Sequence, residues 1–122
     1  MVNKKQALGQ QGEAAAAHYL HANGLQVIEQ NWHCRAGEID IVARDGETWV
    51  FAEVKSRRSI QDDAPFEAIT SHKQGRMIRA AETYVDLHQL ENAAWRIDVI
   101  AVVFAASGAP HIEHVKDALN WA

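Results

Sequence analysis

Several features that would reveal the chemistry of a protein are scarce in this sequence. It contains one cysteine, Cys34, and two prolines. A single cysteine excludes an internal disulfide and a Cys-x-x-Cys motif, so we expect an inert thiol in a reduced, cytoplasmic protein. The low proline content and seven glycines exclude collagen-like and linker-like chains.

Long apolar runs are also missing. A membrane-spanning helix needs about 18 consecutive apolar residues, and no stretch approaches that length. The start, MVNKKQALGQQGE, has lysines but no apolar segment after them, so we expect no secretory signal and no membrane contact. The length fits one domain over residues 1–122.

The basic excess that is usual in nucleic-acid-binding domains is absent, because the net charge is −4. The acids are unevenly distributed, however. Residues 1–79 hold ten basic and ten acidic side chains, whereas residues 80–122 hold two basic and six acidic ones. The first two thirds are therefore neutral and can still present a basic surface.

Apolar periodicity and turn residues predict an α/β domain. The expected order is α-β-β-β-α-β-β, with helices over 7–23 and 66 to about 90, strands over 25–32, the hairpin 38–55, 94–105 and 111–115, and a short last helix over 116–121. A mixed central sheet flanked by helices is the natural packing for this order. The histidine pairs His18/His21 and His111/His114 lack further metal ligands and are expected to be surface or half-buried residues.

The hairpin carries the clearest chemical signal. Asp45-Gly46 predicts a two-residue type I′ loop, and side-chain alternation then places Glu38, Asp40, Glu53 and Lys55 on one face. The apolar side chains of the other face are expected to meet the core. The expected cross-strand pairs are Glu38 with Glu53 and Asp40 with Phe51.

In this register Asp40 and Glu53 are diagonal neighbours with Cβ atoms about 7 Å apart. Two such carboxylates can close on one Mg²⁺ or Mn²⁺, with the carbonyl of Val54 and the carboxylate of Glu38 as further ligands. Lys55 can hold a metal-bound water or stabilise charge on a phosphate. The alternative is a surface hairpin with ordinary ion pairs, such as Glu53 with Lys55.

These motifs resemble known families. The pattern Asp40-x12-Glu53-Val54-Lys55, after a helix that carries Glu13, is similar to the PD-(D/E)xK nuclease superfamily. The longer segments resemble the uncharacterised bacterial YraN-like family, which is assigned to the endonuclease-like fold: LGQQGEAAAAHYL (8–20), GEIDIVARDGETWVFAEVKSR (37–57) and HKQGRMIRAA (72–81). Ile39 departs from the superfamily, which has proline before the aspartate.

The resemblance implies a restriction-endonuclease-like core and roles for four residues. Asp40 and Glu53 would be the metal carboxylates, and Lys55 the catalytic lysine. Glu13 would hold a second metal or a water, as in the resolvase-like branch. The expected activity is Mg²⁺- or Mn²⁺-dependent hydrolysis of nucleic acid, with DNA, including branched DNA, as substrate.

Five basic residues are candidates for phosphate contacts. Arg57 and Arg58 directly follow the hairpin, whereas Lys73, Arg76 and Arg79 follow one flank of the second helix. A solvated helix flank is the alternative for the last three. The competing function is a non-catalytic module that binds nucleic acid or a partner, and the small size favours a homodimer in either case.

Overall fold

A computed structural model of the chain describes residues 3–58, 70–106 and 108–119. No helix within these ranges is long and apolar enough to cross a membrane. The elements, in chain order, are α1 (Lys4–Ala22), β1 (Gln26–Cys34), β2 (Gly37–Asp45), β3 (Thr48–Arg57), α2 (Ser71–Leu87), β4 (Trp95–Val103) and β5 (His111–Val115).

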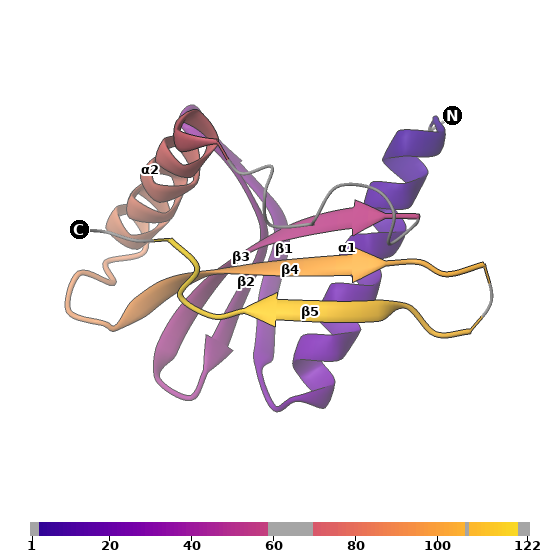
Figure 1. The fold of residues 1–122 in the computed structure, drawn as a ribbon. Helices are drawn as coiled ribbons and strands as arrows, with labels where there is room; N and C mark the ends of the chain where they lie inside the picture. The colour runs from indigo at the N-terminus through magenta and orange to yellow at the C-terminus, as the bar shows by residue number, and fades with distance from the viewer. Residues whose placement is uncertain (1–2, 59–69, 107, 120–122) are drawn as a thin grey trace.

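The strands form one five-stranded mixed sheet in the order β1-β2-β3-β4-β5 (Figure 1). The pairs β1–β2, β2–β3 and β4–β5 are antiparallel, and β3–β4 is parallel. A parallel pair needs a crossover connection, and α2 lies in the connection between β3 and β4. The predicted mixed α/β class is confirmed.

Each helix covers its own apolar core. Leu20 of α1 packs in a cluster that includes Ile41 and Val50, whereas Tyr84 of α2 packs in a cluster that includes Phe51. Successive residues of a strand point to opposite faces, so β3 contributes to both clusters. The predicted apolar face of the hairpin meets the core beneath α1, and the opposite face also contributes apolar side chains to the core beneath α2.

Both helices begin at a side-chain cap. The Asn3 side chain accepts from the backbone N–H of Gln6 at 2.8 Å, and the Gln6 side chain accepts from the N–H of Asn3 at 3.0 Å. This reciprocal cap starts α1 earlier than predicted, at Lys4. Thr70 caps α2 by accepting from the N–H of Lys73 at 3.1 Å, and residues 66–69 of the predicted second helix lie outside the described residues.

The β2–β3 hairpin is present, but its loop and register differ from the prediction. Asp45 pairs with Thr48, so the two loop residues are Gly46 and Glu47. Gly46 has φ +61 and Glu47 is not in the positive-φ region, which is the pattern of a type II′ loop rather than type I′. The glycine therefore occupies the first loop position, where II′ turns require it.

This change moves the pairing by two residues. Ile41 pairs with Ala52 and Val42 with Phe51, so the continuation of this register brings Asp40 level with Glu53. The predicted opposition of Asp40 to Phe51 was wrong. Because the shift is even, the side chains keep their faces.

The predicted last helix is wrong where the structure describes it. Residues 116–119 form a turn and bend, in which Asp117 has φ +51 and Leu119 is buried in the core beneath α2. The N–H of Ala118 donates to the Ile97 carbonyl at 2.8 Å, which ties this segment to β4. Residues 120–122 lie outside the described residues.

Candidate metal centre at the fork between β2 and β3

The strands β2 and β3 separate in the middle of the sheet. Their backbone pairing ends at Ile41 and Ala52, whereas β2 stays paired with β1 as far as Gly37 and β3 stays paired with β4 as far as Arg57. Beyond this point the Asp40 carboxylate, not the β2 backbone, accepts the next β3 N–H, that of Val54, at 2.8 Å. We call this opening the fork.

Two carboxylates meet in the fork. Asp40 is 8% exposed and the Glu53 side chain 11% exposed. Burial, and next the negative charge of Glu53, raise the pKa of Asp40 from 3.8 to about 8. The hydrogen bond from Val54 favours the ionised form but is outweighed by burial and by Glu53, so Asp40 holds its proton at neutral pH.

Two lysines lie beside these acids. Lys73, on the first turn of α2, places its Nζ 2.7 Å from Oε1 of Glu53. Lys55 is buried, and burial together with the nearby charge of Lys73 lowers the pKa of Lys55 below 10.5. A lysine with a lowered pKa gives up its proton more easily, which suits a group that positions or deprotonates water.

Glu13 reaches the same neighbourhood from α1. Burial raises its pKa, a hydrogen bond from Asn31 opposes the rise, and the charges of Glu38 and Glu53 add to it. The preceding residue, Gly12, lies against β3, where a Cβ atom would be 2.9 Å from the Cβ of Ser56. The absence of a side chain at Gly12 therefore lets α1 approach closely enough to bring Glu13 to the fork.

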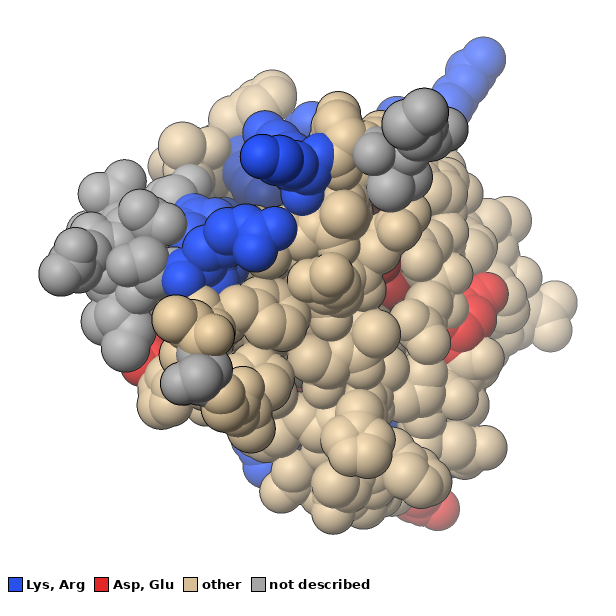
Figure 2. All heavy atoms as spheres, turned by 90° about the vertical axis from the view of Figure 1, so that its right-hand side faces the viewer, with Lys and Arg blue, Asp and Glu red and all other residues tan. Residues whose placement is uncertain are grey.

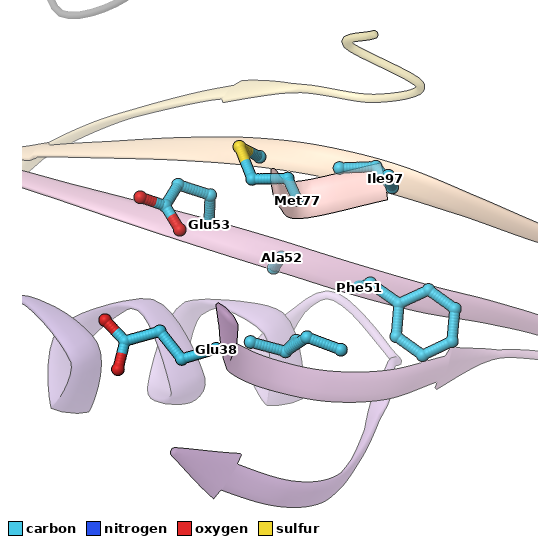
Figure 3. A pocket seen from close by; sticks show the side chains of 7 residues that line it. Glu38, Phe51, Ala52, Glu53, Met77 and Ile97 are labelled. Carbon is cyan, nitrogen blue, oxygen red and sulfur yellow. The ribbon is translucent and has the colours of Figure 1, made fainter. Parts of the chain in front are cut away.

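Glu38, the predicted fourth acid, lies further out. It is exposed, and its Oε2 is 3.3 Å from Nδ1 of His33 on β1. Figure 3 shows the carboxylates of Glu38 and Glu53 projecting in the same direction from β2 and β3. Both acids also line a cavity of about 230 Å³ between the strands and α2. Its other lining residues are Gly37, His72, Lys73, Arg76 and Met77. We call it the α2 cavity.

The donor set of the fork fits a hard cation such as Mg²⁺. Among the described residues no three carboxylate, imidazole or thiol groups form a complete cage. Mg²⁺ commonly binds through one or two carboxylates and keeps several waters, so Asp40 and Glu53 are sufficient. The N–H and C=O of a strand residue point to the same side, which directs the carbonyl of Val54 toward Asp40 as a further oxygen ligand.

The five predicted phosphate-binding residues lie in two regions, on α2 and at the end of β3. Lys73 contacts Glu53 in the fork, and Arg76 is exposed and lines the α2 cavity. Arg79 is exposed but lies along its own helix near Gly75, outside the cavity lining. The remaining two are at the end of β3, where Arg57 donates to the Ser56 carbonyl at 3.1 Å and Arg58 is exposed.

The face at the carboxyl ends of β3 and β4 carries a basic cluster. Figure 2 shows this face, with Lys and Arg side chains gathered together and acidic side chains at a few scattered points. Arg57 and Arg58 belong to this end of β3. The two basic residues that follow the hairpin in sequence therefore lie on this face, whereas Lys73, Arg76 and Arg79 lie on α2.

Sequence reasoning missed two features. His72 lines the α2 cavity, although only its position beside Lys73 hinted at this. His114, expected to be an ordinary histidine, has a 6% exposed side chain with Nε2 2.7 Å from Oδ2 of Asp98. Asp98 also accepts from Nε of Arg96 at 3.0 Å, so the Arg96–Asp98 pair is a buried structural pair away from the lining of the α2 cavity.

Comparisons with known proteins give a consistent family. The sequence model of "Uncharacterised protein family UPF0102" matches residues 12–102. A UPF0102 protein of Arthrobacter sp. (strain FB24) is 43% identical over 112 residues, which are 92% of this chain and 95% of the relative. A UPF0102 protein of Streptomyces griseus subsp. griseus is 47% identical over 116 residues, which are 94% of this chain and 98% of the relative. One of Geotalea daltonii is 42% identical over 120 residues, 98% of this chain and 94% of that protein.

Proposed function

We propose that this chain, which belongs to the uncharacterised protein family UPF0102, is a divalent-metal-dependent nuclease that hydrolyses phosphodiester bonds. DNA, including branched DNA, is the proposed substrate, and Mg²⁺ or Mn²⁺ the proposed cofactor. Membership of the family confirms the YraN-like resemblance of the sequence. Placement in the PD-(D/E)xK superfamily, with a restriction-endonuclease-like core, is part of the proposal.

One observation supports this function most strongly. Asp40 and Glu53 share a largely buried fork, and burial together with the negative charge of Glu53 raises the pKa of Asp40 to about 8. Such an arrangement costs folding free energy and is typical of sites that hold a cation. A bound divalent cation would offset the negative charge and polarise a phosphate oxygen or a water.

The other residues have roles that follow from their positions. Lys55, buried beside the acids, would orient the attacking water or stabilise charge that develops on the phosphate. Glu13, from α1, would hold a second metal or a water. The cluster at the end of β3, with Arg57 and Arg58, would bind the phosphate backbone on either side of the cleaved bond.

A non-catalytic binding module is the second candidate. The observation in its favour is that both carboxylates have partners within the protein, because Asp40 accepts from the Val54 N–H and Glu53 pairs with Lys73. In that case the basic cluster and the α2 cavity would still bind nucleic acid, while the fork would serve only the fold. A homodimer is proposed from size alone for either function, and light scattering that gives the monomer mass of 13.6 kDa at micromolar concentration would contradict it.

A cleavage assay separates the two functions. Single-stranded, duplex, flap and four-way DNA are incubated with the wild-type protein in Mg²⁺, in Mn²⁺ or in EDTA. We expect metal-dependent cleavage that is lost in Asp40→Asn and Lys55→Ala and kept in Glu47→Gln, which removes an exposed charge at the hairpin loop. Salt-sensitive binding without cleavage in either metal would favour the module, and undiminished cleavage by purified Asp40→Asn would exclude the proposed site.

A further inference from the structure

Glu53 already has a counter-ion in the metal-free protein. The ammonium of Lys73 lies 2.7 Å from Oε1 of Glu53. The two partners differ in freedom, because the Lys73 side chain is 43% exposed and that of Glu53 only 11% exposed. Lys73 can therefore rotate away into solvent, whereas Glu53 is held where it is.

A divalent cation on Glu53 would compete with this ion pair. The ammonium of Lys73 occupies the space beside the carboxylate that a metal ion would need. Its positive charge also repels a divalent cation that approaches Glu53. Lys73 also lies beside Lys55, which adds a second positive charge next to the same acid. When a cation binds Glu53, Lys73 loses its counter-ion, so a contact between its ammonium and an anion becomes favourable.

The α2 cavity offers the place for that anion. Lys73 lines it together with His72 and Arg76, which all project from the first two turns of α2. The wall formed by β2 and β3 includes the acids Glu38 and Glu53, so basic side chains line the cavity from α2 and acidic ones from the strands. A phosphate fits between them only when the acidic side is neutralised, which links the anion to the cation.

We propose that Lys73 has two positions: it pairs with Glu53 in the metal-free protein, and it turns into the α2 cavity to bind a phosphate of the nucleic-acid substrate when a divalent cation takes Glu53. This inference rests on the proposed function and adds to it a residue that couples the cofactor to the substrate. Because coupling between two ligands is reciprocal, substrate then tightens cation binding as much as cation tightens substrate binding.

The test measures binding, not turnover, in the full-length protein. Mn²⁺ affinity is measured by calorimetry, with Asp40→Asn as the variant that removes the site. Affinity for a fluorescent single-stranded oligonucleotide is measured by anisotropy in Ca²⁺ and in EDTA. The test variant is Lys73→Met, which removes the charge but keeps a long side chain. Its matched control is Lys116→Met, which removes the charge of an exposed lysine after β5, outside the cavity lining.

We expect Lys73→Met to bind Mn²⁺ roughly threefold or more tightly than the wild-type protein, because it no longer has to break the ion pair. Lys116→Met should bind it within about twofold of the wild-type value, because solvent screens the more distant charge. The oligonucleotide should bind more weakly to Lys73→Met in Ca²⁺ and about equally in EDTA.

Two results would overturn this inference while the proposed function stands. One is unchanged or weaker Mn²⁺ affinity in Lys73→Met when the wild-type protein binds Mn²⁺ and Asp40→Asn does not. The other is an equal loss of oligonucleotide affinity in Ca²⁺ and in EDTA, which would make Lys73 a simple backbone contact. Absence of Mn²⁺ binding by the wild-type protein would overturn the proposed function and the inference together.

Discussion

At the scale of single residues, Asp40 is the most unusual group in the molecule. It replaces the β2 backbone as the partner of the Val54 N–H and at the same time crowds Glu53. A carboxylate that accepts a backbone hydrogen bond would ordinarily be easy to ionise, but burial and the second acid reverse this. The fork therefore combines a structural hydrogen bond with an unfavourable charge, which is a stability cost that function would explain.

The raised pKa of Asp40 predicts how stability depends on pH without metal. Between about pH 4 and pH 8 the folded protein holds a proton that the unfolded chain has released, so the free energy of unfolding falls as pH rises across this window. Asp40→Asn keeps an oxygen acceptor for Val54 but carries no charge. We expect it to be more stable than wild type at pH 9 by on the order of 1 to 3 kcal/mol.

Urea unfolding in EDTA at pH 5 and pH 9 measures this difference. The gain of Asp40→Asn should be larger at pH 9, and Glu47→Gln, at the exposed hairpin loop, should stay within about 0.5 kcal/mol of wild type at both values. A variant that is less stable than wild type at pH 9 would show that the ionised Asp40 is favourable in the fold.

At the scale of elements, the contact between α1 and β3 decides where Glu13 lies. Gly12 is buried against Ser56, whereas a Cβ on Gly9, one turn earlier, would meet nothing within 4 Å. Gly12→Ala should therefore force α1 away from β3 and cost about 1 to 3 kcal/mol of unfolding free energy. Gly9→Ala should instead stabilise the helix by up to about 1 kcal/mol.

Thermal or urea unfolding of both variants checks this pair, and a cleavage assay on the folded Gly12→Ala protein checks the consequence for Glu13. Equal effects of the two substitutions would mean that helix propensity, not the close approach to Ser56, determines the outcome. The pair is a matched comparison because both replace a glycine by alanine within the same helix.

A second set of contacts joins α1, β4 and β5. Asp98, fully buried on β4, accepts hydrogen bonds from Arg96, from Nε2 of His114 and from the N–H of Asp117, and Nδ1 of His114 lies 3.1 Å from the Tyr19 hydroxyl. Burial alone would raise the pKa of Asp98, but these hydrogen bonds hold it below 3.8. The network fixes the edge strand β5 and the end of α1 to β4.

Because the pKa of Asp98 is lowered by folding, its contribution to stability is present above pH 3.8 and is lost as pH falls below that value. Asp98→Ala should lower the free energy of unfolding by about 3 kcal/mol at pH 7, since the Arg96 guanidinium then loses its buried carboxylate partner. The difference between variant and wild type should shrink at pH 3. Urea unfolding at the two pH values measures it, and an undiminished difference at pH 3 would assign the loss to packing.

At the scale of the whole molecule, the sequence predicted the mixed α/β class and most elements, because apolar periodicity and caps are local signals. It misplaced the hairpin loop, because Asp45-Gly46 and Gly46-Glu47 satisfy the same side-chain alternation and only three-dimensional pairing distinguishes them. It also predicted a helix where hydrogen bonds to β4 hold residues 116–119 in a turn, a tertiary effect invisible in the local pattern.

The candidate site was predictable in part, because side-chain alternation along a strand is a local signal. Asp40, Glu53 and Lys55 follow from alternation within one hairpin, and the structure brings them together. The direct contact of Lys73 with Glu53 did not follow, because it depends on how α2 crosses the sheet. Short-range spacing therefore predicts the acids, and only the packing of distant elements identifies the counter-ion.

The most direct test is a crystal of the protein soaked in Mn²⁺, with anomalous scattering used to locate the metal. We predict an anomalous peak in the fork, between the carboxylates of Asp40 and Glu53 and near the carbonyl of Val54, and no peak there in Asp40→Asn crystals. A fork without anomalous density at saturating Mn²⁺, with the Lys73–Glu53 ion pair unbroken, would contradict the proposed metal centre.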